Sequence, residues 1–267
     1  MMFASDLDRT MIYSHRGFGG EILNIPVRTI EVANGRDISF MTKKAIALLH
    51  KLSEEMMFVP VTTRTTEQYS RVSLFHEEIR PTYAITCNGG VVLKDGKIDK
   101  NWQDYICSKI DGSAASVDDV KRKIEETADA SWLNSIRVVD GFFLYMIINP
   151  PLSTERVKYY SQWAAARGWS FSVQGRKVYL IPSFINKWDA VNYVAKKEGK
   201  QTVYTAGDSN LDVCLIEQAD FGLIPRHGEA AATFGHLGMT QKTGILASEE
   251  IIETILSKRL QFIPGIR

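Results

Sequence analysis

The chain has 267 residues, 45% of them hydrophobic, which is enough for a buried core in one large domain or two unequal ones. Its formal net charge is +1 and no long run of like charge occurs, which argues against a nucleic-acid or membrane surface. The three widely spaced cysteines provide neither a disulfide framework nor a CxxC metal clip. With no leader-like segment and no run of about 18 apolar residues, we expect a cytoplasmic protein, a monomer or weak homodimer, that binds a small ligand.

Short apolar runs bounded by polar residues or turn signals recur near both ends of the chain and predict buried parallel strands. Amphipathic helix patterns lie between them, at 44–56 and at 187–197, the latter ending before Gly199. This alternation is typical of βαβ units and predicts an α/β core with a parallel sheet. The predicted strands are Phe3–Ser5, Met57–Val61, Tyr83–Thr86, Val203–Ala206 and Phe221–Ile224.

The segment after Thr10 departs from this alternation because it lacks a helix pattern. Two strand patterns, Val27–Val32 and Asp37–Met41, flank Asn34-Gly35, a strong signal for a tight β-hairpin. We therefore expect a flap directly after the first strand and its loop.

The spacing of the elements changes between about residues 91 and 181. A hairpin around Asp95-Gly96 is followed by helix patterns at 116–128 and 153–167 and strand patterns at 142–148 and 178–181. Parallel strands are predicted on both sides of this segment, so we interpret it as an insertion of α+β type. The expected division is a discontinuous core of residues 1–88 and 183–267, with residues 89–182 as an inserted domain that covers a site.

Two carboxylates one residue apart, Asp6 and Asp8, follow the first predicted strand. Where the backbone leaves the extended state after the first acid, both side chains can turn toward one ligand. One carboxylate of such a pair can attack a substrate or hold a metal while the other serves as a general acid. Asp is also an ordinary turn residue, so the pair alone is equally consistent with a solvated turn.

Further polar clusters follow other predicted core strands or open helices. The carboxyl ends of parallel strands share one edge of a sheet, where α/β proteins bind ligands. Hydroxyls there can hold a phosphoryl oxygen, a lysine at a helix start can bind an anion, and acids can hold a metal. The clusters are Thr62 and Thr63 with Arg64 after a strand, Lys187 at the start of a helix, and Asp208 with Asp212 around another helix start.

These clusters, in this order, resemble the motifs of haloacid dehalogenase superfamily phosphohydrolases. The likeness is to the branch with a large inserted α+β cap of the C2 type, as in Cof-type and sucrose-phosphate-phosphatase-like enzymes. Asn88-Gly89-Gly90 also matches the Asn-Gly-small turn by which that branch enters its cap. The resemblance covers both core segments and implies a Rossmann-like core with a parallel sheet and flap hairpin.

Carried over to this chain, the resemblance implies catalytic roles for Asp6, Asp8 and Lys187. Asp6 is the expected nucleophile, which forms an aspartyl-phosphate. Asp8 is expected to protonate the leaving alcohol and then to deprotonate the hydrolytic water. Lys187 is expected to neutralise charge on the nucleophile and the phosphate, and Thr62 and Thr63 to bind phosphoryl oxygens.

The same resemblance implies a Mg²⁺ cofactor. Its expected ligands are Asp6, the backbone carbonyl of Asp8, and Asp208, with Asp212 supporting the site. A donor set made of oxygens alone suits Mg²⁺, and phosphoryl transfer needs mainly positioning and charge stabilisation.

The sequence departs from the family pattern at three positions. Arg9 stands where a Gly is common, Thr63 where a Gly or Ser is usual, and Leu211 where many relatives have Asn. None of these departures removes a charged catalytic group.

The inserted domain is expected to supply the contacts to the leaving group of a small phosphorylated substrate, by analogy a sugar phosphate or related phosphomonoester. Candidates for these contacts are Asn88, Gln174, Arg176 and Lys177, although a solvated hairpin explains the last three equally well. Three functions remain open: a Mg²⁺-dependent phosphatase, which we favour, a phosphomutase acting on sugar phosphates, and a non-catalytic binder of phosphorylated ligands.

Overall fold

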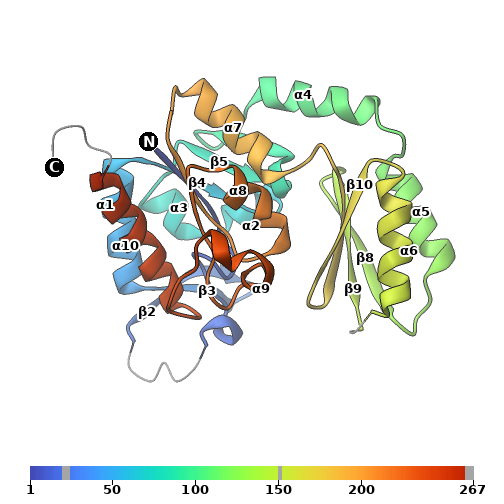
Figure 1. The fold of residues 1–267 in the computed structure, drawn as a ribbon, viewed down its shortest axis with the longest axis horizontal. Helices are drawn as coiled ribbons and strands as arrows, with labels where there is room; N and C mark the ends of the chain where they lie inside the picture. Colours follow the sequence, from blue (N-terminus) through green and yellow to red (C-terminus); the bar gives the residue numbers. More distant parts are fainter. Residues whose placement is uncertain (20–24, 150–151, 262–267) are drawn as a thin grey trace. The chain divides into compact units, whose positions relative to one another are not determined.

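The computed structural model describes residues 1–19, 25–149 and 152–261 and divides into two compact units (Figure 1). The first unit comprises Met1–Ile98 and Lys187–Arg267, and the second comprises Asp99–Asn186. In the part of the chain that is described, no helix has both the length and the apolar character needed to cross a membrane.

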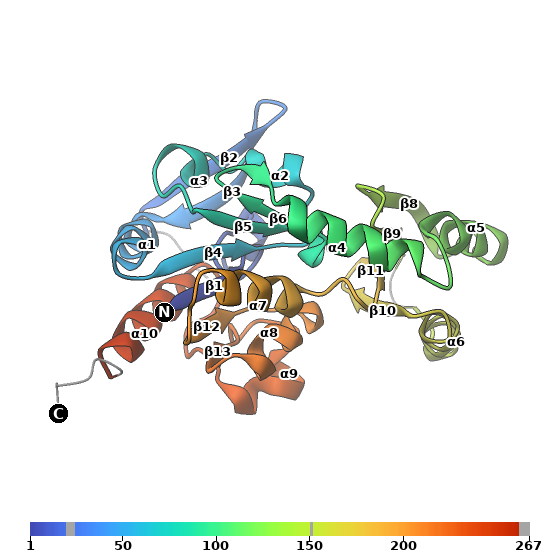
Figure 2. The ribbon, with the colours of Figure 1, turned by 90° about the horizontal axis from the view of Figure 1, so that it is seen from above.

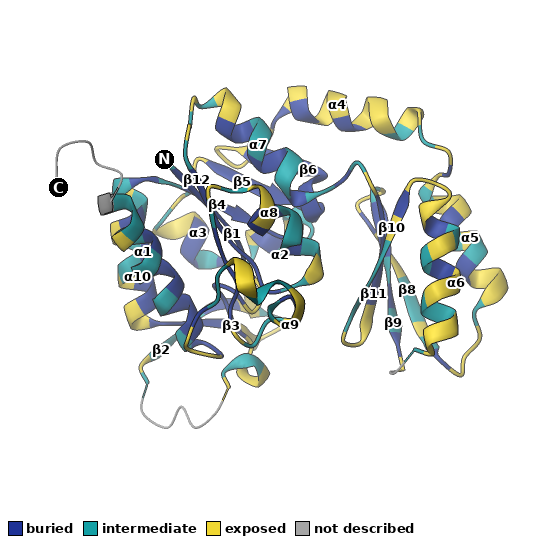
Figure 3. Cartoon of the chain, in the orientation of Figure 1, coloured by how far each residue is buried: buried dark blue, intermediate teal, exposed yellow. Residues whose placement is uncertain are grey.

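The first unit is built on a sheet with the strand order β13-β12-β1-β4-β5-β6-β7. The strands from β13 to β5 run parallel to one another, which confirms the predicted parallel core. They are buried (Figure 3), as expected for strands that read as continuous apolar runs. The bounds are β1 (Met2–Asp6), β4 (Met57–Val61), β5 (Tyr83–Thr86), β6 (Val91–Lys94), β7 (Lys97–Ile98), β12 (Val203–Ala206) and β13 (Phe221–Leu223).

Helices pack around this sheet, and α1 lies beside α10 (Figures 1 and 2). Helix α1 begins where the Thr42 hydroxyl accepts a hydrogen bond from the Ala45 N–H, as an N-cap does. Helix α7 ends before Gly199, whose φ of +61° is a left-handed conformation favourable for glycine. The bounds are α1 (Lys43–Glu55), α2 (Thr66–Ser70), α3 (Ser73–Glu77), α7 (Lys187–Lys197), α8 (Val213–Gln218), α9 (Ala231–Phe234) and α10 (Leu246–Gln261).

The predicted flap is present as a hairpin of β2 (Val27–Ala33) and β3 (Arg36–Thr42). Its turn residues, Asn34 and Gly35, both have positive φ, which is the geometry of a tight hairpin turn. A backbone bridge from Glu31 to Val72 joins the flap to the segment between α2 and α3.

The second predicted hairpin forms, but it belongs to the first unit, contrary to the expected boundary after residue 88. Strand β6 pairs antiparallel with β5 and extends the central sheet, and β7 pairs with β6. The positive φ angles of Cys87, Asn88 and Gly89 turn the chain back along β5. Strand β6 also buries three apolar side chains, so the sheet keeps it and the chain leaves the unit only after Ile98.

The second unit is an α+β structure with an antiparallel sheet in the order β10-β11-β9-β8. Its buried side chains include Trp102, Trp132 and Trp169, and the indole Nε1 of Trp169 donates to the Ala115 carbonyl at 3.1 Å. The bounds are α4 (Lys100–Asp111), α5 (Val117–Thr127), β8 (Leu133–Val139), β9 (Phe143–Ile148), α6 (Thr154–Ala165), β10 (Trp169–Gln174) and β11 (Lys177–Pro182).

Candidate active site

Polar residues of the first unit meet at the carboxyl edge of the parallel strands. Asp6 is the last residue of β1 and pairs in register with Val61, the last residue of β4. Thr62 therefore follows immediately beside Asp6, and Asp208 lies two residues beyond the end of the neighbouring β12. The sheet topology thus brings three of the sequence motifs to one edge.

Lys187 connects two of the acids at this edge. It is the first residue of α7 and is only 1% exposed. Its Nζ donates to Asp6 Oδ1 at 2.6 Å and to Asp212 Oδ1 at 2.5 Å. Burial lowers the pKa of Lys187, but the two carboxylates outweigh burial and the net pKa is raised. Lys187 is therefore a buried, permanently charged ammonium group.

Asp212 is fixed by its own loop. Its second oxygen, Oδ2, accepts hydrogen bonds from the Ser209 backbone N–H at 2.9 Å and from the Ser209 hydroxyl at 2.7 Å. A Cβ placed on Gly207 would lie 2.2 Å from the Asp212 Cβ, so this approach requires glycine. The Gly207 motif position therefore serves the placement of Asp212.

Asp6, Asp208 and Asp212 form a buried acidic cluster, with one carboxylate oxygen from each lying within 4.8 Å of the others. Asp6 Oδ2 is buried and has no hydrogen-bond partner among the described residues. Burial, followed by the charge of Asp212, raises the pKa of Asp6 to about 7, and burial followed by the charge of Asp6 raises that of Asp208 to about 8. Crowded oxygen ligands with excess negative charge and an unsatisfied oxygen are the donor set that suits Mg²⁺.

Asp8 lies in a different environment, although it is two residues from Asp6. Its side chain is 50% exposed and accepts two hydrogen bonds from Arg64, from Nε to Oδ2 and from Nη2 to Oδ1, both at 2.7 Å. Arg64 Nη1 also donates to Glu31 Oε2 at 2.9 Å, and Nη2 donates to the Ser39 hydroxyl at 3.2 Å. Arg64 thus links Asp8 to both strands of the flap.

Of the predicted phosphate-binding threonines, Thr62 follows β4 directly and lies beside the end of β1. Thr62 is buried, and its hydroxyl accepts a hydrogen bond from the Arg64 backbone N–H at 3.1 Å, which leaves the hydroxyl proton for a ligand. Thr63 is half-buried. Asn88, expected among the contacts from the insertion, instead lies in the first unit, where its backbone N–H donates to the Thr62 carbonyl at 2.9 Å.

The remaining candidates lie in the second unit at the turn between β10 and β11. Arg176 and Lys177 are exposed, and the Lys177 Nζ lies 5.3 Å from the centre of the Tyr145 ring. Gln174 Nε2 is buried without a hydrogen-bond partner among the described residues. Their contact with a leaving group therefore stays a prediction.

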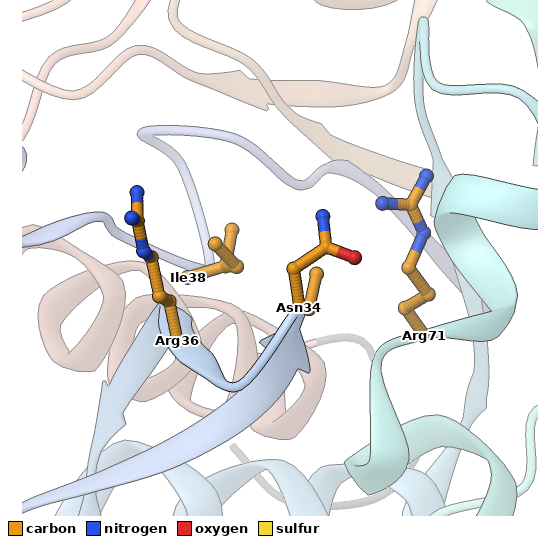
Figure 4. A pocket seen from close by; sticks show the side chains of 5 residues that line it. Asn34, Arg36, Ile38 and Arg71 are labelled. Atoms are coloured by element: carbon orange, nitrogen blue, oxygen red, sulfur yellow. The ribbon is translucent and has the colours of Figure 1, made fainter.

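A separate hollow of about 480 Å³ opens at the tip of the flap (Figure 4). Arg36 and Arg71 flank it, with Asn34 between them in the view. Its lining residues are distinct from those of the acidic cluster.

Two residues of the site escaped the sequence reasoning, Glu31 and Ser39 of the flap. The Ser39 hydroxyl donates to Glu31 Oε2 at 2.6 Å, and both side chains are buried against Arg64. The glutamate within the predicted flap strand was a usable signal. A carboxylate is rarely buried without a partner, so Glu31 in a strand pattern indicates that a cationic side chain packs against the flap.

No protein-family model matches this sequence, and no curated protein is similar to it at the level of sequence. Solved structures are similar along nearly the whole chain. The sucrose-phosphatase from Synechocystis sp. PCC6803, in complex with sucrose and phosphate, has a TM-score of 0.68 and 15% identity, with 96% of this chain and 97% of that chain covered. A trehalose-6-phosphate phosphatase related protein has a TM-score of 0.55 and 17% identity, with coverage of 98% and 99%.

A haloacid dehalogenase-like hydrolase protein from Bacillus subtilis is also similar, with a TM-score of 0.54 and 15% identity over 98% of this chain and 92% of that chain. The chain therefore has the fold of haloacid dehalogenase-like hydrolases that carry a cap domain. This agrees with the fold that the sequence motifs predicted.

Proposed function

We propose that this protein is a Mg²⁺-dependent phosphatase that hydrolyses a small phosphorylated metabolite through an aspartyl-phosphate on Asp6. The observation that carries the proposal is the state of Asp6 itself. One of its oxygens is held by Lys187, while the other is buried and unpaired among the described residues, beside two further acids. A buried, oriented carboxylate with one oxygen available is what attack on phosphorus requires.

The proposed reaction has two balanced steps. In the first, an Asp6 oxygen forms a bond to phosphorus, the bond to the leaving oxygen breaks with its electron pair, and protonated Asp8 gives that oxygen its proton. In the second, Asp8 takes a proton from water, the water oxygen attacks the same phosphorus, and the bond to Asp6 breaks to release phosphate. In this reaction Lys187, which donates to Asp6, and the Thr62 hydroxyl would stabilise the negative charge on the phosphoryl group.

Arg64 bears on this cycle because it holds Asp8 with two charge-assisted hydrogen bonds. This arrangement suits the carboxylate form of Asp8, which the second step uses. The first step needs the protonated form, so substrate binding must loosen the pair between Arg64 and Asp8.

The acidic cluster fits a divalent cation, which Asp6 and Asp208 would hold with Asp212 in support. The family resemblance adds the backbone carbonyl of Asp8 to this ligand set. When bound, Mg²⁺ would neutralise carboxylate and phosphoryl charge. The unpaired Asp6 oxygen supports this assignment, as do the raised pKa values of Asp6 and Asp208, which reflect burial first and the negative charge of the neighbouring acids second.

We also infer that the second unit acts as the cap and that Gln174, Arg176 and Lys177 contact the leaving group. Two of the similar solved structures are named for phosphatases of sugar phosphates or a protein related to one. Sugar phosphates are therefore the first substrates to test.

The test is a phosphate-release screen over phosphorylated metabolites with Mg²⁺, comparing the wild type with Asp6→Asn and Asp8→Asn. Loss of the nucleophile is expected to lower activity by at least about 10³-fold, and loss of the general acid by about 10²–10⁴-fold. Asp95→Asn is the matched control, because Asp95 is exposed in a turn with positive φ, which Asn adopts readily. Equal activity of the wild type and Asp6→Asn would overturn the proposal, and isomerisation of a sugar phosphate without phosphate release would identify a mutase instead.

A further inference from the structure

Arg9 occupies a backbone position that is unfavourable for its residue type. Its φ is +64°, in the left-handed region where glycine is the usual residue. The position lies in the loop after β1, between Asp8 and the buried Thr10. A side chain kept at such a position points to a use for that side chain.

The Arg9 side chain is directed at the acidic cluster. Its Nε lies 3.2 Å from Asp208 Oδ2, and its Nη2 donates to the His227 carbonyl at 3.1 Å. His227 closes the arrangement, because its Nδ1 accepts from the Gly244 N–H at 3.0 Å and its Nε2 therefore donates to the Arg9 carbonyl at 2.9 Å. Both the backbone and the guanidinium of Arg9 are thus anchored to the loop that carries His227.

The ion pair of Arg9 with Asp208 adds a positive charge to a site with excess negative charge. Three buried carboxylates, those of Asp6, Asp208 and Asp212, face one ammonium group, that of Lys187. Lys187 bonds to Asp6 and Asp212, so Asp208 receives its direct cationic partner from Arg9. The guanidinium of Arg9 therefore forms an ion pair with Asp208, the carboxylate that is expected to bind the metal.

We propose that Arg9 is an internal counter-cation of Asp208, which holds the acidic cluster together without a metal and lowers its affinity for divalent cations. The inference rests on the metal site of the proposed function. A guanidinium and a divalent cation on the same carboxylate repel each other, and the side chain of Arg9 is 57% exposed, so solvent weakens this repulsion. Removing the charge of Arg9 should tighten divalent cation binding by about three- to tenfold.

The experiment is a titration of metal-free protein with Mn²⁺, followed by electron paramagnetic resonance of the free ion and without substrate. Arg9→Gln removes the charge, Arg9→Lys keeps it, and Arg16→Gln is the control because Arg16 is an exposed arginine of the same loop region. We expect tighter binding in Arg9→Gln, while Arg9→Lys and Arg16→Gln stay within about twofold of the wild type. Raising the salt concentration should narrow the difference.

A second readout is the thermal stability of the metal-free protein. Arg9→Gln should melt at a lower temperature than the wild type without metal and should gain more from saturating Mn²⁺. Arg9→Gly relieves the backbone as well, so it should also bind Mn²⁺ more tightly, and it replaces Arg9→Gln should that variant fail to fold.

Unchanged or weaker Mn²⁺ binding in both neutral variants would overturn the role of Arg9. Weaker binding would mean that Arg9 orients Asp208 for the metal rather than competing with it. Because no substrate is used, this failure is distinct from failure of the proposed function, which the phosphate-release screen tests. Absence of Mn²⁺ binding in the wild type and in both neutral variants would overturn both the metal site and the role of Arg9.

Discussion

Replacement of Lys187 by methionine should destabilise the metal-free protein strongly. The side chain is 1% exposed and holds Asp6 and Asp212, so its removal leaves two buried carboxylates without their cation. Breaking a buried ion pair by removing one partner costs about 3–5 kcal/mol. In a protein of this size each kcal/mol moves the melting temperature by about 2–4 °C, so a fall of about 6–20 °C is expected.

Scanning calorimetry of metal-free Lys187→Met measures this loss, with Lys196→Met as the matched control. Lys196 lies on the same helix but is exposed, so its replacement should stay within about 0.5 kcal/mol. Lys187 lowers the pKa of Asp6, so the variant carboxyl will protonate more readily. The loss should therefore be larger at pH 8 than at pH 6. A loss below about 1 kcal/mol at pH 8 would refute the view that Lys187 compensates these acids.

Two further predictions concern the same cluster. Gly207→Ala places a Cβ 2.2 Å from that of Asp212, so it should lower the free energy of unfolding by about 1–3 kcal/mol in calorimetry and weaken Mn²⁺ binding. Gly112→Ala is the control and should be nearly neutral, because the nearest atom to its Cβ lies at 3.6 Å. Burial raises the pKa of Asp6 to about 7 and that of Asp208 to about 8. Between about pH 4 and pH 8 the metal-free folded protein therefore holds protons that the unfolded chain has released, so its stability should fall as the pH rises through this range. The rise in melting temperature caused by Mg²⁺ should accordingly be larger at pH 8.5 than at pH 6, and an equal rise at both would contradict the link between protons and metal.

The core of the fold was predictable because its signals are local. Buried parallel strands read as short apolar runs, and β4, β5 and β12 have the bounds that the sequence indicated. The sequence also predicted the hairpin of β6 and β7, but it did not indicate that this hairpin extends the central sheet. Pairing with β5 depends on the turn at 87–89 and on burial against a neighbour, and neither has a local pattern.

The candidate site divides in the same way. Asp6, Lys187, Asp208 and Asp212 stand at strand ends or helix starts, so sequence position alone brings them to one edge. Partners contributed by the flap could not be predicted, because the contact of Glu31 with Arg64 joins residues 33 positions apart through the packing of side chains. The partner of Arg9 was likewise unpredictable, since the loop of His227 is 218 positions away.

Asp6 and Asp8 acquire different properties through their places on the backbone and through their different cationic partners. Asp6 is the last residue of β1 and is buried, while Asp8 stands beyond the strand and its side chain is half exposed. Leu7 between them is fully buried and fixes this separation. Burial makes charge on Asp6 costly unless a cation is present, whereas Arg64 stabilises charge on Asp8 in contact with solvent. A single intervening residue thus provides one carboxylate that depends on a cation and another that can exchange protons with water.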